Sequence, residues 1–519
     1  MKRLASLAEL SSRTEPFDIV IIGGGASGLG AAVDGALRGH SVLLVEQADF
    51  AKGTSSRSTK LVHGGVRYLK QGNVSLVLEA LRERGLMCRN APHLVHSLPF
   101  VIPNYHWWEG PFYGIGLKVY DGLAGKLGLE PSRYLNREDV IGLLPNIEQQ
   151  DLTGGIIYHD GQFDDSRLAI NLAQTAVEKG AVLLNYVRCA GIVKNGDHVA
   201  GVKLRDEETG EEAEVAAKVV INATGVFADE VRLMDDPQAK TMLSPSQGIH
   251  FVLPREFLPG DTAIMIPKTD DGRVLFAVPW HGRVVVGTTD TPVENASLEP
   301  RALAEEIEFI FTQVSRYLSR DPTRADVLSV YAGLRPLIKS DASSTAALSR
   351  DHLISISDSG LITLAGGKWT TYRKMAEDVI DHAEMIGALD HRYCSTHELP
   401  VHGAVAVPLE ESHLHYYGSD VTGIRTLVQE DAILGETLHP KLEFIRAEVI
   451  WHVRHEMART VEDVLSRRTR ALLLDARASI EAAPVVASLM AREMGKDAAW
   501  ETAQVSAYAT LARGYLLDP

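Results

Sequence analysis

Hydrophobic and polar positions near the start of the chain follow two different periods in close succession. Residues 19–22 are a continuous apolar run, which is typical of a strand buried on both faces of a parallel sheet. Apolar residues then recur at helical spacing from Leu29 to Leu37, and residues 42–45 form a second apolar run. This pattern predicts a strand–helix–strand unit over residues 18–46, and with it an α/β fold that contains a parallel sheet.

The turn between the first strand and the helix carries Gly23, Gly25 and Gly28 in a G-x-G-x-x-G arrangement. Such glycines let the backbone turn sharply and approach a pyrophosphate, and the helix N-terminus offers that group N–H donors and a partial positive charge. Glu46, at the end of the second strand, is placed to accept hydrogen bonds from a ribose hydroxyl. The order of these parts favours a dinucleotide site over a plain structural turn.

The rest of the chain shows further helical and strand patterns but no internal repeat. An antiparallel sheet is expected over residues 246–290, where short apolar runs alternate with Gly, Pro and Asp. Residues 1–16 are polar and are expected to form a loose tail. Helices are expected over residues 74–90, 166–180 and 301–318, and over most of the chain beyond about residue 396.

Composition and charge narrow the class of protein. A chain of 519 residues is too long for one compact core, so two or three domains are expected. The net charge of −16 argues against a nucleic-acid partner, whose phosphates would repel it. The 3 cysteines are widely spaced, which excludes a disulfide framework or a zinc ribbon and suits a reducing compartment. No metal site is expected, because His413 and His415 look like surface residues.

The sequence predicts neither a signal peptide nor a membrane-spanning segment. The first residues lack an apolar stretch, and no apolar run is long enough to cross a bilayer. Contact with a membrane surface remains open, because residues 105–120 are rich in aromatic residues and glycine, with Lys118 among them. Aromatic and basic residues favour a bilayer interface, and the alternative is that these aromatics pack in a core.

Two later segments favour a flavin over a nicotinamide dinucleotide. Residues 219–225 (Val-Val-Ile-Asn-Ala-Thr-Gly) resemble the second flavin motif of two-dinucleotide-domain flavoproteins, and residues 364–368 (Leu-Ala-Gly-Gly-Lys) resemble the third. After the third motif, the N-terminus of the following helix would stabilise negative charge on a reduced flavin. Segments so far apart suit the long FAD molecule, although each alone also fits an ordinary buried strand and turn.

The loop at residues 53–69 (Gly-Thr-Ser-Ser-Arg-Ser-Thr-Lys-Leu-Val-His-Gly-Gly-Val-Arg-Tyr-Leu) resembles that of the FAD-dependent, quinone-linked glycerol-3-phosphate dehydrogenases. The similarity extends over about residues 16–515. This sequence departs from the family at Ser27, where Asn is common, at Arg57, where a small residue is common, and at residues 226–227, which replace Pro-Trp. The other similar motifs are Trp280 and residues 286–290, 331–336, 348–351, 366–374 and 459–470.

The resemblance implies a Rossmann-like FAD-binding domain, an antiparallel-sheet substrate domain and a C-terminal helical cap. The FAD-binding domain is expected in two parts, separated by an insertion close to the membrane and the substrate. The expected divisions are a flexible tail (1–16), the first FAD-binding part (17–90), the insertion (91–150), the second FAD-binding part (151–240), the substrate-domain sheet and helix (241–325), a segment that closes the active site (326–395) and the cap (396–519).

The resemblance also implies the site residues. Its substrate, a dianionic phosphate ester with a secondary alcohol, requires several fixed cations, for which arginine gives bidentate contacts. Substrate contacts are expected from Arg67, Tyr68, His250, Arg335, Arg350 and Lys368. FAD contacts are expected from Gly23, Gly25, Ser27, Gly28, Glu46, Thr54, Ser55, Ser56, Ser58, Lys60, His63, Gly64, Gly65, Ala223, Thr224, Gly225, Gly366, Gly367, Lys368 and Thr370.

The implied reaction oxidises the C2 alcohol of glycerol 3-phosphate by hydride transfer to FAD. A neutral histidine suits the base that removes the hydroxyl proton, so His250 is the expected base. Arg335 and Lys368 are expected to stabilise the alkoxide, and such cations can also lower the pKa of the alcohol directly.

The family passes its electrons to membrane quinone, which implies a peripheral position on the inner face of the cell membrane. A homodimer is left open. The alternatives are a glycerol-3-phosphate oxidase that uses oxygen, an amine or amino-acid oxidase of the same superfamily, and a flavin-binding sensor or assembly protein without turnover.

Overall fold

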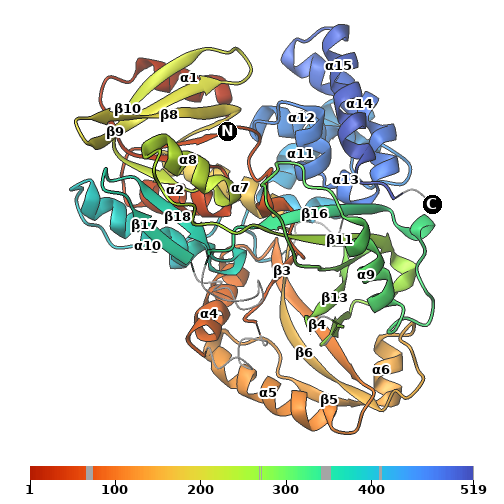
Figure 1. Ribbon diagram of the computed structural model, residues 1–519. Helices are drawn as coiled ribbons and strands as arrows, with labels where there is room; N and C mark the ends of the chain where they lie inside the picture. The colour runs from red at the N-terminus through yellow and green to blue at the C-terminus, as the bar shows by residue number, and fades with distance from the viewer. Residues whose placement is uncertain (66–73, 268, 271, 340–351, 408–411, 518–519) are drawn as a thin grey trace.

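The predicted strand–helix–strand unit is present, and both of its strands belong to the first sheet (Figure 1). The computed structural model describes the whole chain apart from residues 66–73, 268, 271, 340–351, 408–411 and 518–519. The strands of this sheet are β1 (Phe17–Ile22), β2 (Val42–Glu46), β7 (Val182–Asn185), β8 (Val187–Asn195), β9 (His198–Asp206), β10 (Glu212–Asn222), β17 (His352–Ile356) and β18 (Ile362–Gly366). They run in the order β17-β18-β10-β1-β2-β7, with β8 and β9 as a hairpin beside β10. The pairs along this order are parallel except for β17 with β18.

Both faces of this sheet are covered, which explains the continuous apolar runs of its strands. The helices α2 (Ala26–Leu37), α7 (Asp165–Glu178) and α10 (Tyr372–Ile386) contribute to the core that contains Ile19 and Ile21. Val20 and Ile22 point the other way, into a core shared with the β8–β9 hairpin. A strand with one face in water would alternate apolar and polar residues, and this strand has no such face.

A second, ten-stranded sheet is mainly antiparallel, as predicted for residues 246–290, but it also recruits segments from earlier in the chain. Its strands in spatial order are β15 (Thr291–Pro292), β11 (Ser246–Pro254), β14 (Arg283–Gly287), β13 (Leu275–Trp280), β12 (Ala263–Ile266), β4 (Val95–Asn104), β6 (Gly154–Phe163) and β3 (Leu61–Val62), with β16 (Ser329–Arg335) beside β11 and β5 (Arg133–Asn136) beside β6.

The second sheet takes strands from several of the expected domain divisions. β3 and β6 were expected in the FAD-binding domain and β4 in a separate insertion, yet all three belong to this sheet. The chain therefore crosses between the two sheets more often than expected. A hydrophobic pattern predicts that a segment is a strand, but it does not say which sheet the strand joins.

Helices surround the second sheet and agree with most of the predicted positions. The helix predicted over residues 74–90 has the same bounds, whereas the one predicted over 301–318 is shorter. Its first residue follows Leu303, whose backbone is extended and whose N–H donates to the Glu306 carboxylate at 3.1 Å. The helices around the second sheet are α4 (Val74–Asn90), α5 (Glu109–Ala124), α6 (Arg137–Leu143) and α9 (Ala304–Val314). The helix α8 (Ala228–Asp235) packs against the first sheet instead.

The C-terminal region is helical, as predicted, and forms a cap beside both sheets (Figure 1). Its longest helix starts where the Asp475 side chain accepts a hydrogen bond from the Ala478 N–H and ends at Gly495, which is left-handed. Residues Asp463–Arg468 form a π-helical turn. The cap helices are α11 (Val421–Glu430), α12 (Arg446–His455), α13 (Ala471–Leu474), α14 (Ala476–Met494) and α15 (Ala498–Arg513).

The start of α7 connects the cap to the rest of the molecule through buried charges. The Asp164 carboxylate lies 2.9 Å from Arg470 Nε, and Arg167 donates to both carboxylate oxygens of Glu456 at 2.7 and 2.9 Å. Asp165, between Asp164 and Arg167 in the sequence, accepts hydrogen bonds from Lys60 Nζ of the loop after β2, at 2.7 and 2.8 Å. One helical turn thus holds the cap and the loop after β2 together.

The loose tail expected for residues 1–16 is wrong. Residues Arg3–Ser12 form the helix α1, and Arg3 is buried with its guanidinium 2.6 Å from the Asp206 carboxylate. The Met1 amino group donates to the His455 carbonyl at 2.7 Å. These anchors lie far away in the sequence, so the polar composition of the segment gave no sign of them.

Candidate active site

The three predicted glycine turns meet at one cavity of about 240 Å³ on the first sheet. The turns follow β1, β10 and β18, and the carboxyl ends of parallel strands are where such sheets bind ligands. The predicted residues that line this cavity are Gly23, Gly25, Ser27, Glu46, Thr54, Ser55, Ala223, Thr224, Gly225, Gly366, Gly367 and Lys368. Lys52 lines it too and was not predicted.

The glycines of the first turn serve two different needs. A Cβ on Gly28 would lie 1.9 Å from the Gly23 carbonyl oxygen, and one on Gly23 would lie 2.6 Å from the Ala223 carbonyl oxygen. These two glycines are required by the packing of the chain itself. A Cβ on Gly25 would meet only Ser55 Oγ, at 3.1 Å, and would otherwise project into the cavity. The open space at Gly25 therefore fits a bound pyrophosphate that approaches the backbone.

Glu46 is held at the end of β2 as predicted. Its two carboxylate oxygens accept hydrogen bonds from the Gly24 N–H at 2.7 Å and the Ala48 N–H at 3.0 Å. Burial raises the pKa of Glu46, although these two backbone donors oppose the shift. Each oxygen keeps a second lone pair, so the carboxylate can still accept a hydrogen bond from a ligand in the cavity.

Several residues expected to contact FAD do not line this cavity. Lys60 is fully buried, and its Nζ binds both oxygens of Asp165 and the Ser56 carbonyl. Ser58 Oγ also donates to Asp165, at 2.7 Å. The structure shows that these residues fix the loop to α7, and their contact with FAD stays a prediction. Ser56, Gly64 and Thr370 are buried beside the loop or at the start of α10.

A second cavity, of about 180 Å³, lies on the second sheet next to the first cavity. Arg335 lines the second cavity, and the next residue, Pro336, lines the first. His63 and Gly65, which were expected to contact FAD, line this second cavity. The other lining residues include Thr59, Phe100, Tyr158, Asp160, Arg273, Phe276, Thr288, Thr289 and Asp290.

Arg335 is fixed in the second cavity by several acceptors. Its Nη2 donates to the Thr289 carbonyl at 3.0 Å and to Thr288 Oγ1 at 3.3 Å, and its Nη1 lies 3.3 Å from the Asp290 carboxylate. Arg273, which was not predicted, approaches the same carboxylate at 3.7 Å. It directly follows a glycine, as the predicted Lys368 does, but this local signal is shared by many surface residues. Two guanidinium groups therefore converge in this cavity.

His250 lies behind the wall of the second cavity. Its ring stacks on Tyr331 with 4.8 Å between the ring centroids, and its Nε2 is 2.8 Å from Thr59 Oγ1. Burial lowers the pKa of His250 well below its ordinary value, and the positive charges of Arg335 and Lys60 lower it further. The ring is therefore neutral, as a base must be, but Thr59 stands between it and the cavity. Arg67, Tyr68 and Arg350 lie outside the described residues.

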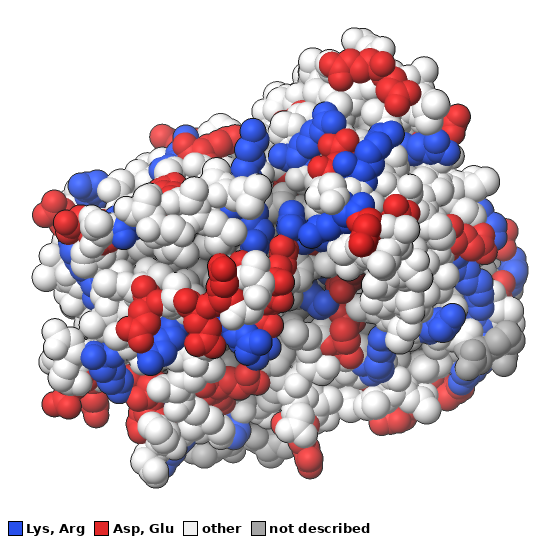
Figure 2. Space-filling model, turned by 90° about the horizontal axis from the view of Figure 1, so that it is seen from above, with Lys and Arg blue, Asp and Glu red and all other residues white. Residues whose placement is uncertain are grey.

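The aromatic segment at residues 105–120 is divided between core and surface. Tyr120 and Leu117 are buried, whereas Trp107 is 85% exposed and Trp108 46% exposed. Phe112, Ile115 and Val119 of α5 are also exposed and extend this apolar face. α5 lies at the end of the molecule opposite the cap (Figure 1), and on the face seen from above acidic and basic residues are interspersed among uncharged ones (Figure 2). Among the described helices, none is both long and apolar enough to cross a membrane.

The fold and the first cavity define a flavoprotein of the FAD-dependent oxidoreductase class. A family model described as FAD dependent oxidoreductase matches residues 18–373, and one described as the C-terminal domain of alpha-glycerophosphate oxidase matches residues 360–501. FAD is therefore the cofactor, and the residues around the first cavity fit it.

Within that class, the chain belongs to the glycerol-3-phosphate dehydrogenase family. It is 40% identical to a mitochondrial glycerol-3-phosphate dehydrogenase of Arabidopsis thaliana, over 93% of this chain and 84% of that protein. It is also 40% identical to the mitochondrial glycerol-3-phosphate dehydrogenase of Homo sapiens, over 95% of this chain and 73% of that one. The structure of the glycerol-3-phosphate dehydrogenase from Bacillus halodurans complexed with FAD superposes with a TM-score of 0.81 at 29% identity, covering 99% of this chain and 98% of that chain.

Proposed function

We propose that this protein oxidises sn-glycerol 3-phosphate to dihydroxyacetone phosphate. The observation that carries the proposal is the second cavity, which adjoins the FAD cavity and holds two arginines around one buried carboxylate. A phosphate dianion suits guanidinium groups that are already fixed in place, since little side-chain freedom is lost on binding. The names of the relatives support the same substrate.

The chain's own residues divide the chemistry between the two cavities. When bound, FAD supplies the acceptor for the hydride that leaves C2. The Gly25 turn and Glu46, which line the first cavity, would hold its pyrophosphate and ribose, and the turn at residues 366–368 would approach its flavin. Arg335 and Arg273 bind the phosphate, and Lys368 stabilises the negative oxygen that develops at C2.

The hydroxyl proton leaves through Thr59 to His250. Thr59 Oγ1 takes the proton from the alcohol and passes its own proton to His250 Nε2, which lies 2.8 Å away. Because the pKa of His250 is lowered, the ring holds the proton only transiently and returns it through Thr59 Oγ1 to the cavity, where water takes it up. This role differs from direct contact between His250 and the substrate.

Membrane quinone is the proposed electron acceptor, and the protein is proposed to lie peripherally on the inner face of the cell membrane. The exposed apolar face of α5 supports contact with a lipid surface, where a lipid-soluble quinone is found. Oxygen is the second candidate acceptor, and the match of residues 360–501 to an oxidase domain favours it.

Anaerobic mixing of the purified yellow protein with single compounds tests the reaction. Glycerol 3-phosphate should bleach the flavin absorbance within the time of a turnover, whereas glycerol and glycine should not. Bleaching by glycine would identify an amine or amino-acid oxidase, and no bleaching by any of the three would refute the proposal. Reoxidation by a short-chain quinone without peroxide identifies the dehydrogenase, and rapid peroxide formation in oxygen identifies the oxidase.

A further inference from the structure

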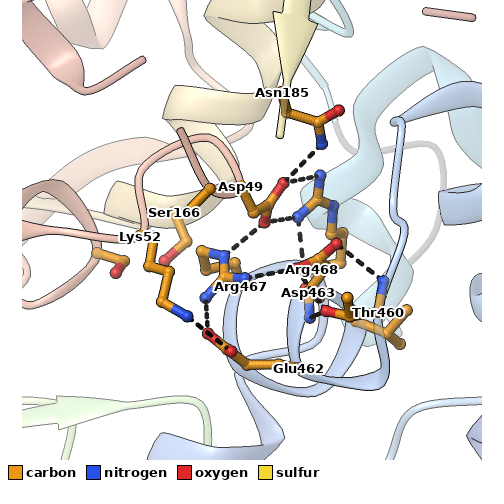
Figure 3. Close-up of polar contacts among 12 residues, drawn as sticks. Asp49, Lys52, Ser166, Asn185, Thr460, Glu462, Asp463, Arg467 and Arg468 are labelled. Carbon is orange, nitrogen blue, oxygen red and sulfur yellow. Dashed lines mark hydrogen bonds and ion pairs between the residues drawn. The ribbon is translucent and has the colours of Figure 1, made fainter. Parts of the chain in front are cut away.

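A buried cluster of charges joins the cap to the loop that follows β2 (Figure 3). The loop contributes Asp49 and Lys52, and the cap contributes Glu462 together with Asp463, Arg467 and Arg468 of the π-helical turn that follows it. We call these six residues the Asp49 cluster. Asp49, Asp463 and Arg468 are completely buried, and Arg467 almost completely.

Asp49 is the point where the cap holds the loop. Arg468 donates to both of its carboxylate oxygens, and Arg467 Nε donates to one of them at 2.5 Å. Asn185 at the end of β7 adds a fourth hydrogen bond, at 3.3 Å. Burial alone would raise the pKa of Asp49, but Arg468 and Arg467 outweigh it and keep the carboxylate charged.

The cluster continues to the wall of the FAD cavity. Arg467 Nη1 donates to Glu462 at 2.8 Å, and Glu462 in turn accepts from Lys52 Nζ at 2.8 Å. Lys52 itself lines the FAD cavity. Three charged contacts therefore lead from Asp49 through Arg467 and Glu462 of the cap to Lys52 in the wall of the FAD cavity.

The backbone of the same loop reaches the cofactor turn more directly. The Ala48 N–H donates to Glu46, and the Ala51 N–H donates to the Gly24 carbonyl at 2.9 Å. Asp49 lies between these two donors in the sequence. Fixing the Asp49 side chain thus fixes the two peptide groups that hold Glu46 and Gly24 in place.

Buried charges stabilise a structure only when their partners are in position. An unpaired Asp49, Arg467 or Arg468 would lose solvation without compensation, so the cluster favours only the loop conformation in which all three meet. A ligand that favours the same loop conformation is coupled to the cluster, and the coupling is reciprocal.

We infer that Arg467 and Arg468 are positioning residues for FAD: through Asp49 they hold the loop of residues 46–52 in its FAD-binding conformation. Docking of the cap and binding of FAD consequently strengthen each other. The inference concerns the cofactor, so it does not depend on which substrate the second cavity takes.

The chain offers a matched pair of variants. Asp49→Asn and Glu456→Gln each turn a fully buried carboxylate into its amide, and each carboxylate accepts both ends of an arginine between the cap and the FAD-binding domain. Glu456 pairs with Arg167 of α7 and does not reach the loop, although its carboxylate lies 4.0 Å from Arg468 Nε. A merely structural role predicts the same effect for both variants.

The experiment measures FAD release from diluted holoenzyme by the rise of flavin fluorescence. We expect Asp49→Asn to release FAD at least tenfold faster than the parent, and Glu456→Gln to stay within about twofold. Excess FAD in the assay should restore most of the turnover of Asp49→Asn. Arg468→Lys keeps the positive charge but loses the contact with both carboxylate oxygens of Asp49, so this variant should also release FAD faster. Arg468→Lys takes the place of Asp49→Asn in the experiment if Asp49→Asn does not fold.

Three results would overturn the inference. They are FAD release from the Asp49 and Arg468 variants at the parent's rate, equal acceleration in the Asp49 and Glu456 variants, and turnover of Asp49→Asn that excess FAD does not restore.

Discussion

Replacing both Trp107 and Trp108 with Ser should detach the protein from lipid. The two indoles lie just before α5 and continue its exposed apolar face. Indole rings settle at the level of the lipid headgroups because one part is apolar and the N–H is polar. The substitution removes this surface without touching either cavity, since neither residue lines one.

The size of the effect follows from the exposed area. With roughly 200 Å² for each indole side chain, the exposures of 85% and 46% leave roughly 260 Å² in contact with water. If about half of this area enters the lipid interface, at ~25 cal/mol per Å², it contributes roughly 3 kcal/mol. The double variant should therefore bind vesicles about two orders of magnitude more weakly.

Sedimentation with phospholipid vesicles measures this binding, and Tyr393→Ser is the control because Tyr393 is 88% exposed but lies outside the α5 segment. The control should pellet like the parent. Reduction of a quinone embedded in vesicles should slow in the double variant, while reduction of a soluble dye by glycerol 3-phosphate should not change. A double variant that pellets like the parent, or that loses quinone and dye activity equally, would refute a membrane role for these side chains.

Three further predictions concern the two cavities and the Asp49 cluster. Gly25→Val should fold but lose FAD, because the new side chain enters the cavity. Gly28→Ala should instead lower the melting temperature, because its Cβ overlaps the Gly23 carbonyl. Measuring the flavin content and the thermal unfolding of both variants tests the two expectations. Arg335→Ala should lower kcat/KM for glycerol 3-phosphate at least tenfold with FAD still bound, since a charged hydrogen bond contributes about 1.5–3 kcal/mol. The surface variant Arg320→Ala should leave kcat/KM unchanged. Parent-like kinetics of Arg335→Ala would exclude a role of Arg335 in substrate binding. Burial alone would raise the pKa of Glu462, but Arg467 and Lys52 lower it from 4.5 to about 2, so its contribution to stability is complete above pH 4.5 and is lost as the pH falls toward 2. The melting temperature of the parent should thus fall more steeply over this range than that of Glu462→Gln, and parallel curves would contradict the assignment.

The parts that the sequence predicted well are local in the chain. The β1–α2–β2 unit, the glycine turn and Glu46 lie within one short segment, so period and spacing are enough to identify them. The turns after β10 and β18 were also found, because each combines an apolar strand with glycine. Their meeting at one cavity follows from the rule that parallel strands present their carboxyl ends at the same edge.

The parts that the sequence did not predict depend on contacts between distant residues. Lys60 stands in a motif that suggested FAD, but Asp165, far along the chain, binds its Nζ. His250 has the residue type of a base, yet its register in β11 places it behind Thr59. Arg273 was overlooked because its partner Asp290 is brought close only by the second sheet. No local pattern carries such information.

The charged first turn of α7 has a consequence for how molecules enter and leave. A cap that swung away would leave Asp164, Arg167 and their partners buried or half-solvated without their counter-charges. Separating buried charges from their partners is unfavourable, and two such pairs would have to separate together, so an opened cap is a minor state. The cap therefore stays docked during turnover, and substrate and product enter and leave past other segments of the chain.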